Sequence, residues 1–217
     1  MHSIQTTIKR FLAVSAVAIL AAASTQAWAM TDAQFLAANT FLQQANAGDK
    51  DAIATAVEKF ESLSKAEPTN PVALVHLGAA TSMQARTTML PWKKISFAED
   101  GMGMEDKALA LLDASHDTLL VNGVPASLSV RFVTASTFLA VPSMFNRRAQ
   151  GASLLNDVVR SPLLANASLT FRGAVWMRAA KWAVDDKRVE DAKRFLDMVV
   201  KAGAPQADAA KTQLATL

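Results

Sequence analysis

The sequence predicts an all-α protein of about nine helices, arranged as antiparallel hairpins behind an N-terminal export signal. Apolar residues recur three and four positions apart through most of the chain, which is the period of a helix with one buried face. Gly, Pro and Asn interrupt these stripes at short intervals, as the turns between paired helices do. No segment shows the β-branched, alternating pattern that competes for a strand.

The first 29 residues have the pattern of a signal peptide. Lys9 and Arg10 precede an apolar run, residues 11–23, that is too short to span a bilayer comfortably. Ala27-Trp28-Ala29 has the A-x-A form of a cleavage site. We therefore expect a periplasmic mature chain, residues 30–217, that folds as one domain without a stable membrane anchor. An uncleaved anchor is the alternative, and the lack of any Cys excludes a lipoprotein.

The charge balance argues against a nucleic-acid partner. Removing Lys9 and Arg10 from the 22 basic residues leaves 20 against 19 acidic residues, a net charge of +1. A nucleic-acid protein would carry a basic excess gathered on one face. Because the chain has no Cys, it forms no disulfides, and its stability must come from packing.

Two helices open the expected mature chain. Thr31 or Asp32 is placed to cap the first helix, Gly48 ends it, and Asp49 is placed to cap the second. A turn this short makes the two helices an antiparallel hairpin. The stripes that would face inward are Phe35, Ala38, Phe41, Leu42 and Ala45 on the first helix and Ile53, Ala56, Val57, Phe60 and Leu63 on the second.

A third helix begins near Asn70, with Pro71 at its first position, where the missing N–H costs little. The second helix, the turn and the third helix together resemble the tetratricopeptide repeat (TPR), which runs W-x2-L-G-x2-Y, then A-x3-F, then P. The matching residues are Ala56, Phe60 and Pro68, then Leu74, Leu77 and Gly78 with Thr81 in place of Tyr, and again Trp176, Ala192 and Leu196.

The resemblance implies a TPR-like α-solenoid of stacked hairpins and a role in binding another protein. It also implies a reason for Gly78, which costs about 1 kcal/mol inside a helix relative to Ala. The repeat offsets that cost by letting a neighbouring helix approach closely, so a Gly78→Leu change should destabilise the chain by overpacking.

The repeat spacing then breaks. Pro91, Gly101 and Gly103 make one smooth helix unfavourable, so residues 87–103 are expected to be an insertion between helices, partly loop. Insertions in repeat arrays fall on one face, often the binding face. The fourth helix is then expected over residues 104–116.

The remaining helices are marked by their starts and ends. Pro125 opens the fifth after an Asn122-Gly123 turn, Pro142 precedes the sixth, and Ser161-Pro162 precedes the seventh, which ends near Asp185. The eighth ends before Gly203, and a short ninth covers residues 205–215. Terminal repeats need such a polar cap for solubility.

No enzyme motif stands out in the sequence. It has no Cys nucleophile, no G-x-S-x-G, no H-E-x-x-H and no phosphate loop. His76 and His116 each stand alone in their segments, whereas a general base needs a positioned partner. We therefore expect no catalytic residues, no resident metal and no cofactor.

Two segments are expected to bind a partner protein. The first places Trp92, Lys93, Lys94 and Phe97 in the predicted insertion, and Trp beside basic residues is the composition of an interface anchor. The alternative is that Trp92 and Phe97 fold back into the core.

The second segment follows Pro142 and contains Phe145, Arg147 and Arg148. Two cations at a helix N-terminus are unfavourable unless an anion lies nearby, which suggests an acidic contact. The alternative is that Arg147 pairs with a neighbouring helix and Arg148 is solvated.

These features favour a periplasmic, TPR-like adaptor or scaffold that binds another protein, accessory to an envelope transport or assembly complex. A second hypothesis is a periplasmic protein that binds Cu(I) or another small ligand through methionines, because thioethers select Cu(I). Its residues would be Met83, Met89, Met102 and Met104, although Met is also an ordinary filler of helix packing.

Overall fold

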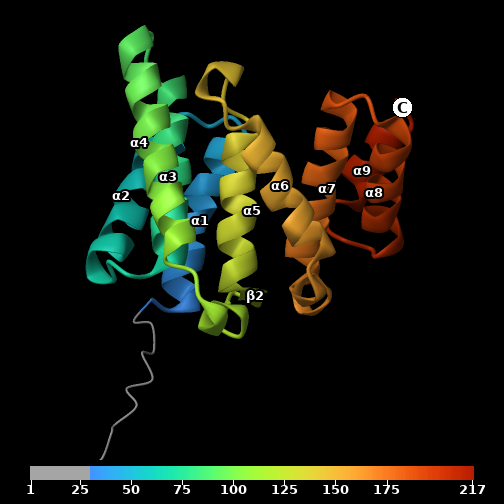
Figure 1. Cartoon of the computed structure of the whole chain (residues 1–217), viewed down its shortest axis with the longest axis horizontal. Helices are drawn as coiled ribbons and strands as arrows, with labels where there is room; N and C mark the ends of the chain where they lie inside the picture. Colours follow the sequence, from blue (N-terminus) through green and yellow to red (C-terminus); the bar gives the residue numbers. More distant parts are fainter. Residues whose placement is uncertain (1–29) are drawn as a thin grey trace, which may run out of the picture.

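The computed structural model describes residues 30–217 and confirms the all-α fold class (Figure 1). The predicted signal peptide, residues 1–29, lies outside the described residues. Within the described range, the nine α-helices are α1 (Asp32–Asn46), α2 (Asp51–Ala66), α3 (Pro71–Met83), α4 (Pro91–Ala110), α5 (Ala126–Phe138), α6 (Arg148–Arg160), α7 (Leu169–Asp185), α8 (Val189–Lys201) and α9 (Ala207–Leu214). The short 3-10 turns are η1 (Gln84–Arg86), η2 (Ala114–Asp117), η3 (Ser143–Phe145) and η4 (Pro162–Asn166).

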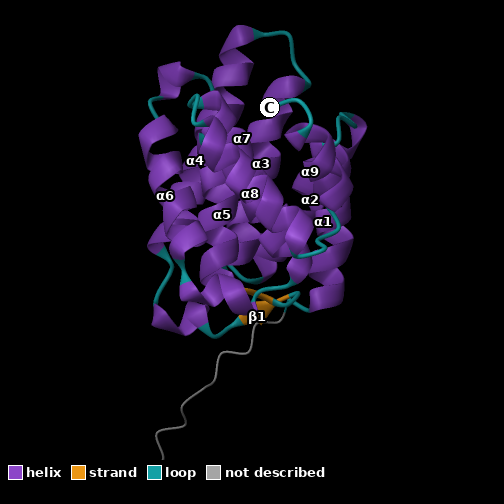
Figure 2. Cartoon of the chain, turned by 90° about the vertical axis from the view of Figure 1, so that its right-hand side faces the viewer, coloured by secondary structure: helices purple, strands orange, loops and turns teal. Residues whose placement is uncertain are grey.

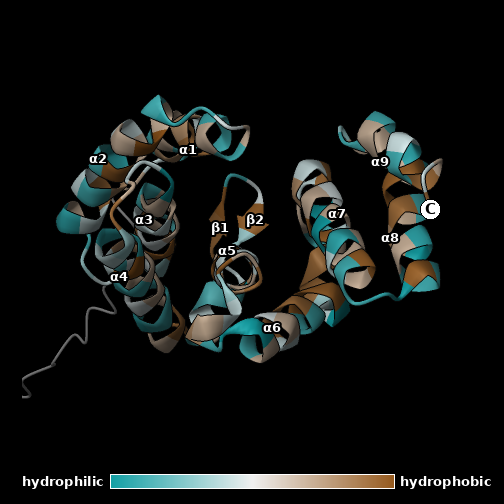
Figure 3. Cartoon of the chain, turned by 90° about the horizontal axis from the view of Figure 1, so that it is seen from above, coloured by the Kyte–Doolittle hydropathy of each residue, from teal (hydrophilic) through white to brown (hydrophobic). Residues whose placement is uncertain are grey.

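Helices that follow one another in sequence are packed against one another, and α3 and α4 also contact α5. Seen from above, the helices follow a curved path, with α1 to α4 on one side, α7 to α9 on the other, and α5 and α6 between them (Figure 3). One apolar cluster joins α1 to α5, and a second joins α5 to α9. The middle helix α5 therefore contributes to both.

Local signals set most helix starts as expected. Thr31 caps α1 by accepting a hydrogen bond from the Gln34 N–H, and the Gln34 side chain accepts one from the Thr31 N–H. Asn70 caps α3 through its side-chain oxygen, and Pro71 occupies the first position of the helix. Each cap satisfies backbone N–H groups that no helical carbonyl can reach.

The helical residues that carry the TPR resemblance are buried, whereas Pro68 in the turn is exposed. Ala56 and Phe60 are fully buried on α2, and Leu74 and Leu77 lie in the same cluster on α3. On the later hairpin, Trp176, Ala192 and Leu196 are buried between α7 and α8. The sequence therefore identified the packed faces of these two hairpins.

The predicted insertion at residues 87–103 is wrong for most of its length. Only residues 87–90 are non-helical, and α4 runs without interruption from Pro91. Pro91 begins the helix, and Gly101 lies where α4 meets α3 most closely. A Cβ on Gly101 would come within 2.4 Å of the Gly78 carbonyl oxygen, so a glycine is required by the contact between the helices.

The fourth helix consequently starts and ends earlier than predicted, and His116 lies in η2 beyond its end. One further feature was not predicted: β1 (Leu120–Val121) and β2 (Val124–Pro125) pair as a two-residue antiparallel ribbon at one end of the helices (Figure 2). The expected turn at Asn122-Gly123 is confirmed, since both residues have positive φ, at 50° and 70°.

Candidate functional site

The start of α4 projects beyond the helices that support it. We call residues 86–94 the α4 tip. The helix α4 has 20 residues and its partner α3 has 13, and Ala98 is the first buried residue of α4. Figure 1 shows this end of α4 at the top of the molecule. The first two turns of α4 therefore contain no buried residue.

Large apolar side chains are nevertheless concentrated in the α4 tip. Met89 is 86% exposed, Trp92 is 65% exposed and Leu90 is 39% exposed. A solvent-exposed Trp is unusual, because its large apolar surface normally drives it into a core or an interface. The alternative in which Trp92 folds back into the core is therefore wrong, whereas Phe97 is half-buried and does pack partly inward.

The same tip is basic. Arg86, Lys93 and Lys94 are exposed, and no acidic residue occurs between Arg86 and Ala98. None of the three forms an ion pair within residues 30–217. The tip thus combines uncovered apolar surface with uncompensated positive charge.

The connection between α5 and α6 lies at the same end of the molecule (Figure 1). Its η3 turn exposes Met144, 69% of whose surface is accessible. Phe145, in contrast, is half-buried and packs with Val141 against Ala98, Met102 and Phe138. The structure therefore makes Phe145 a packing residue that holds this connection against α4.

The two predicted arginines are engaged with neighbouring helices. Arg147 donates from both terminal nitrogens to Asp106 of α4, at 3.2 and 2.6 Å, and its guanidinium lies 4.8 Å from the centre of the Phe138 ring. The guanidinium of Arg148 lies 4.3 Å from the centre of the Trp182 ring. The acidic contact expected near this pair is Asp106, so pairing of Arg147 with a neighbouring helix is confirmed.

The four methionines of the copper hypothesis do not gather at one place in the fold. Met102 packs with Ala98 and Phe138, whereas Met83 is buried in the other cluster, where Met104 also packs. Met102 and Met104 are two positions apart on α4, which places them on different sides of the helix. Met89 is exposed in the tip. The fold brings no pair of these thioethers into one apolar cluster except Met83 and Met104.

The two histidines have structural partners. His76 is buried between the rings of Phe35 and Phe60, and its Nδ1 lies 2.8 Å from the Val72 carbonyl oxygen. Burial lowers the pKa of His76 to about 4, so the ring is neutral at pH 7. His116 Nδ1 lies 2.8 Å from an Asp113 oxygen that also accepts a hydrogen bond from Ser115. Ser115 and His116 thus share one oxygen of Asp113, the cap residue of η2.

Glu105 is the residue that the sequence did not single out. It is fully buried where α4 meets α3 and α5, and Thr137 of α5 donates to its Oε1 at 2.6 Å. Its Oε2 has no hydrogen-bond partner within residues 30–217. Burial raises its pKa well above the usual value, the Thr137 hydrogen bond and Arg147 oppose the rise, and the Asp106 charge adds to it. A continuous helix over residues 91–110 would have placed Glu105 on the apolar stripe of Ala98, Met102 and Ala108.

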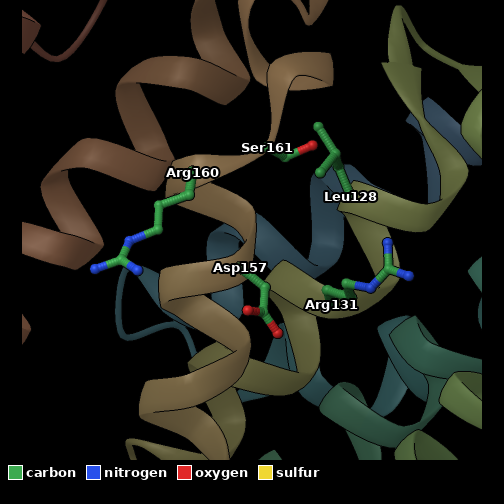
Figure 4. A pocket seen from close by; sticks show the side chains of 5 residues that line it. All are labelled: Leu128, Arg131, Asp157, Arg160 and Ser161. Carbon is green, nitrogen blue, oxygen red and sulfur yellow. The ribbon is translucent and has the colours of Figure 1, made fainter.

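Two shallow pockets also lie on the surface of the described residues. One, of about 340 Å³, is lined by Leu128, Arg131, Asp157, Arg160 and Ser161 (Figure 4). In this view the two arginine side chains point away from each other, so they do not converge on one anion. The other, of about 500 Å³, lies around Thr69, Asp113 and His116, where local caps use the polar groups.

Residues 30–217 contain no group of three or more His, Cys, Asp and Glu side chains arranged to hold a metal ion. Within the same range, no helix has the length and apolar character needed to cross a membrane. Comparisons of the chain with protein families, with curated proteins and with solved structures found no match.

Proposed function

We propose that this chain is a periplasmic, TPR-like adaptor or scaffold that binds another protein through the α4 tip, as an accessory to an envelope transport or assembly complex. The proposal rests above all on one observation, the 65% exposure of Trp92 beside Lys93 and Lys94 on a projecting helix end. The proposal that the chain is exported rests on the signal-peptide pattern of residues 1–29. The solenoid arrangement is supported by the buried TPR-like positions of α2–α3 and α7–α8.

The chemistry of the tip indicates the kind of partner. Trp92, Met89 and Leu90 offer apolar anchors of the type that supply most binding energy at interfaces. Arg86, Lys93 and Lys94 would steer and orient a partner with a complementary acidic surface. We therefore propose an acidic protein with an apolar recess that accepts Trp92.

The other predicted contact residues have supporting roles in this proposal. Phe145 and Arg147 fix the α5–α6 connection to α4, which holds Met144 at the same end as the tip. Arg148 stacks on Trp182 and is removed from the proposed contact surface. The positions of the methionines do not support the copper alternative.

The test is affinity capture from the native envelope, followed by a binding measurement with the purified partner. Trp92→Ala and the double change Lys93→Glu/Lys94→Glu should each weaken binding about tenfold or more, because losing a hot-spot contact costs about 2 kcal/mol or more and about 1.4 kcal/mol is a factor of ten. The charge changes should also reduce the dependence of binding on salt. Circular dichroism should show unchanged helix content in both variants.

Lys201→Glu is the matched control, because Lys201 is an exposed cation at the far end of the chain. It should leave binding unchanged. Equal binding by wild type and the tip variants would remove the α4 tip from the proposal. Tip-dependent binding to vesicles of anionic lipid, with no protein partner affected, would replace the acidic protein with a membrane surface.

A further inference from the structure

The first described residue is held by a side chain far away in sequence. Met30 is only 8% exposed and belongs to the apolar cluster of α1 to α5. Its backbone N–H donates a hydrogen bond to Oε1 of Glu67. The chain is thus anchored one residue before Thr31, the cap of α1.

Glu67 connects this anchor to the turn between α2 and α3. It follows the last residue of α2, and its Oε2 accepts a hydrogen bond from Nδ2 of Asn70 at 3.0 Å. The Asn70 side-chain oxygen in turn accepts from the N–H groups of Val72 and Ala73, at 2.9 and 3.1 Å, at the start of α3. One carboxylate therefore links the beginnings of α1 and α3.

Glu67 has no side-chain cation opposite it. It is half-buried, and no Lys, Arg or His in residues 30–217 forms an ion pair with it. A partly desolvated carboxylate is stabilised when its hydrogen-bond donors are charged, because charge-assisted bonds are roughly twice as strong as neutral ones. Its two donors are a backbone amide and an Asn amide, both neutral in the uncut chain.

The sequence predicts cleavage at the peptide bond whose hydrolysis would give one of these donors a positive charge. The A-x-A motif ends at Ala29, so the new N-terminus would be the nitrogen of Met30. This is the atom that already donates a hydrogen bond to Glu67. Hydrolysis of the Ala29–Met30 peptide bond by an envelope endopeptidase consumes one water. It leaves a carboxylate on Ala29 and an ammonium group on Met30.

We propose that removal of the leader creates a charged amino terminus at Met30 that forms an ion pair with Glu67, so that processing itself fastens α1 to the α2–α3 turn. The precursor has the hydrogen bond but lacks the charge. Cleavage one residue earlier or later would move the amine by a Cα–Cα step of about 3.8 Å. The ion pair therefore requires a particular cleavage position, and the mature chain is more stable in this region than the precursor.

The first experiment identifies the N-terminus. The full-length chain is exported, purified and analysed by N-terminal sequencing and intact mass. The expected result is a chain that begins at Met30. A mature chain that begins at any other residue, or a precursor that stays uncut, overturns the proposal.

The second experiment measures the coupling between the amine and Glu67. Thermal unfolding is compared for mature wild type and Glu67→Gln, each with a free and with an acetylated amino terminus. With the free amine, Glu67→Gln should lower Tm by about 2–4 °C, and with the acetylated amine by clearly less. Acetylation of the wild type alone should also lower Tm, which tests the charge without any substitution.

Glu58→Gln serves as the control, because Glu58 is an exposed residue on the same helix as the residues that precede Glu67. It should leave Tm nearly unchanged in both forms. An equal loss for Glu67→Gln in the free and acetylated chains would show that Glu67 acts through Asn70 alone, and the proposed ion pair would be rejected.

Discussion

The α3–α4 and α7–α8 hairpins are both antiparallel helix pairs, but they differ in their construction. Only residues 186–188 separate α7 from α8, and the charged side of α8 is neutralised locally, with Arg188 bonded to both Asp186 and Asp191. In contrast, η1 and residues 87–90 separate α3 from α4, and α4 extends past its partner. The later hairpin has compensated charges on its outer side, whereas the earlier one ends in an apolar and basic tip.

The difference is also visible inside the two hairpins. Trp176 and Leu196 fill the contact between α7 and α8 with large apolar side chains. Between α3 and α4, the glycines Gly78 and Gly101 let the backbones touch, and Glu105 is buried beside them. One hairpin is thus packed by large apolar side chains, whereas the other combines close backbones, a buried carboxyl group and an exposed tip. Such departures from local rules are expected where a chain carries function.

Trp92 and Trp176 give the largest contrast between the hairpins. Trp176→Ala should reduce the free energy of unfolding by about 3–5 kcal/mol, because it leaves a cavity in the α7–α8 contact. Trp92→Ala should change it by no more than about 0.5 kcal/mol, because the side chain is exposed in the tip. Urea unfolding of the two variants measures both values. Similar losses would show that Trp92 is packed in solution and would remove the distinction between the hairpins.

Substituting Ala for each of the two glycines of α4 should change the stability of the fold in opposite directions. Gly101→Ala places a Cβ against backbone and hydroxyl atoms of α3, which should destabilise the fold by about 1–3 kcal/mol. Gly103→Ala meets no atom within 4 Å and should stabilise α4 by up to about 1 kcal/mol through helix propensity. Thermal unfolding of both variants tests the close contact between the helices. Stabilisation by Gly101→Ala would contradict it.

Glu105 should make stability depend on pH in a way that the α7–α8 hairpin cannot. Its pKa is raised in the folded protein, so its contribution is fully present below the unfolded value of about 4.5 and is lost as pH rises towards the folded pKa. The loss is about 1.4 kcal/mol per pH unit in that window. Glu105→Gln keeps an acceptor for Thr137 and cannot ionise. Its Tm should therefore exceed that of the wild type increasingly as pH rises.

His76 changes the stability in the opposite direction, and its pH window overlaps the lower part of the Glu105 window. Its pKa of about 4 lies below the ordinary 6.5, so its contribution is lost as pH falls from about 6.5 towards 4. Because His76 titrates alike in the wild type and in Glu105→Gln, the difference in Tm between the two proteins isolates Glu105. Glu61→Gln, a change at an exposed carboxyl, is the control. Parallel pH profiles for wild type and Glu105→Gln would show that Glu105 is not held in the neutral form.

Local signals were sufficient for the helices that begin with a capping residue or Pro. Thr31 and Asn70 with Pro71 were identified from a few adjacent residues, and each occupies its expected place. Ser161 and Pro162 were expected to open the seventh helix, but they begin the 3-10 turn η4, and α7 starts at Leu169 with Ser168 as its cap. The fourth helix was mispredicted because Gly101 and Gly103 count against a helix when judged by propensity alone. Propensity does not include the contact with Gly78 that favours a glycine at position 101.

The candidate surface was also predicted only in part, because local composition identifies some of its residues and contacts between helices decide the others. Trp92, Lys93 and Lys94 were identified by composition, and they are exposed as an interface anchor would be. Phe145 and Arg147 were grouped with them, but their partners, Met102 and Asp106, come from a different part of the chain. Met144 could be related to Trp92 only after both connections were placed at one end of the molecule (Figure 1).

The sequence by itself determined the all-α class, the faces that the first two and the seventh and eighth helices bury, and the composition of the α4 tip. These properties follow from the period of apolar residues and from caps, which act over a few positions. Only the tertiary structure decided the course of α4, the burial of Glu105 and the contact between Met30 and Glu67. Those features depend on which residues meet across a helix interface, and no local pattern specifies that meeting.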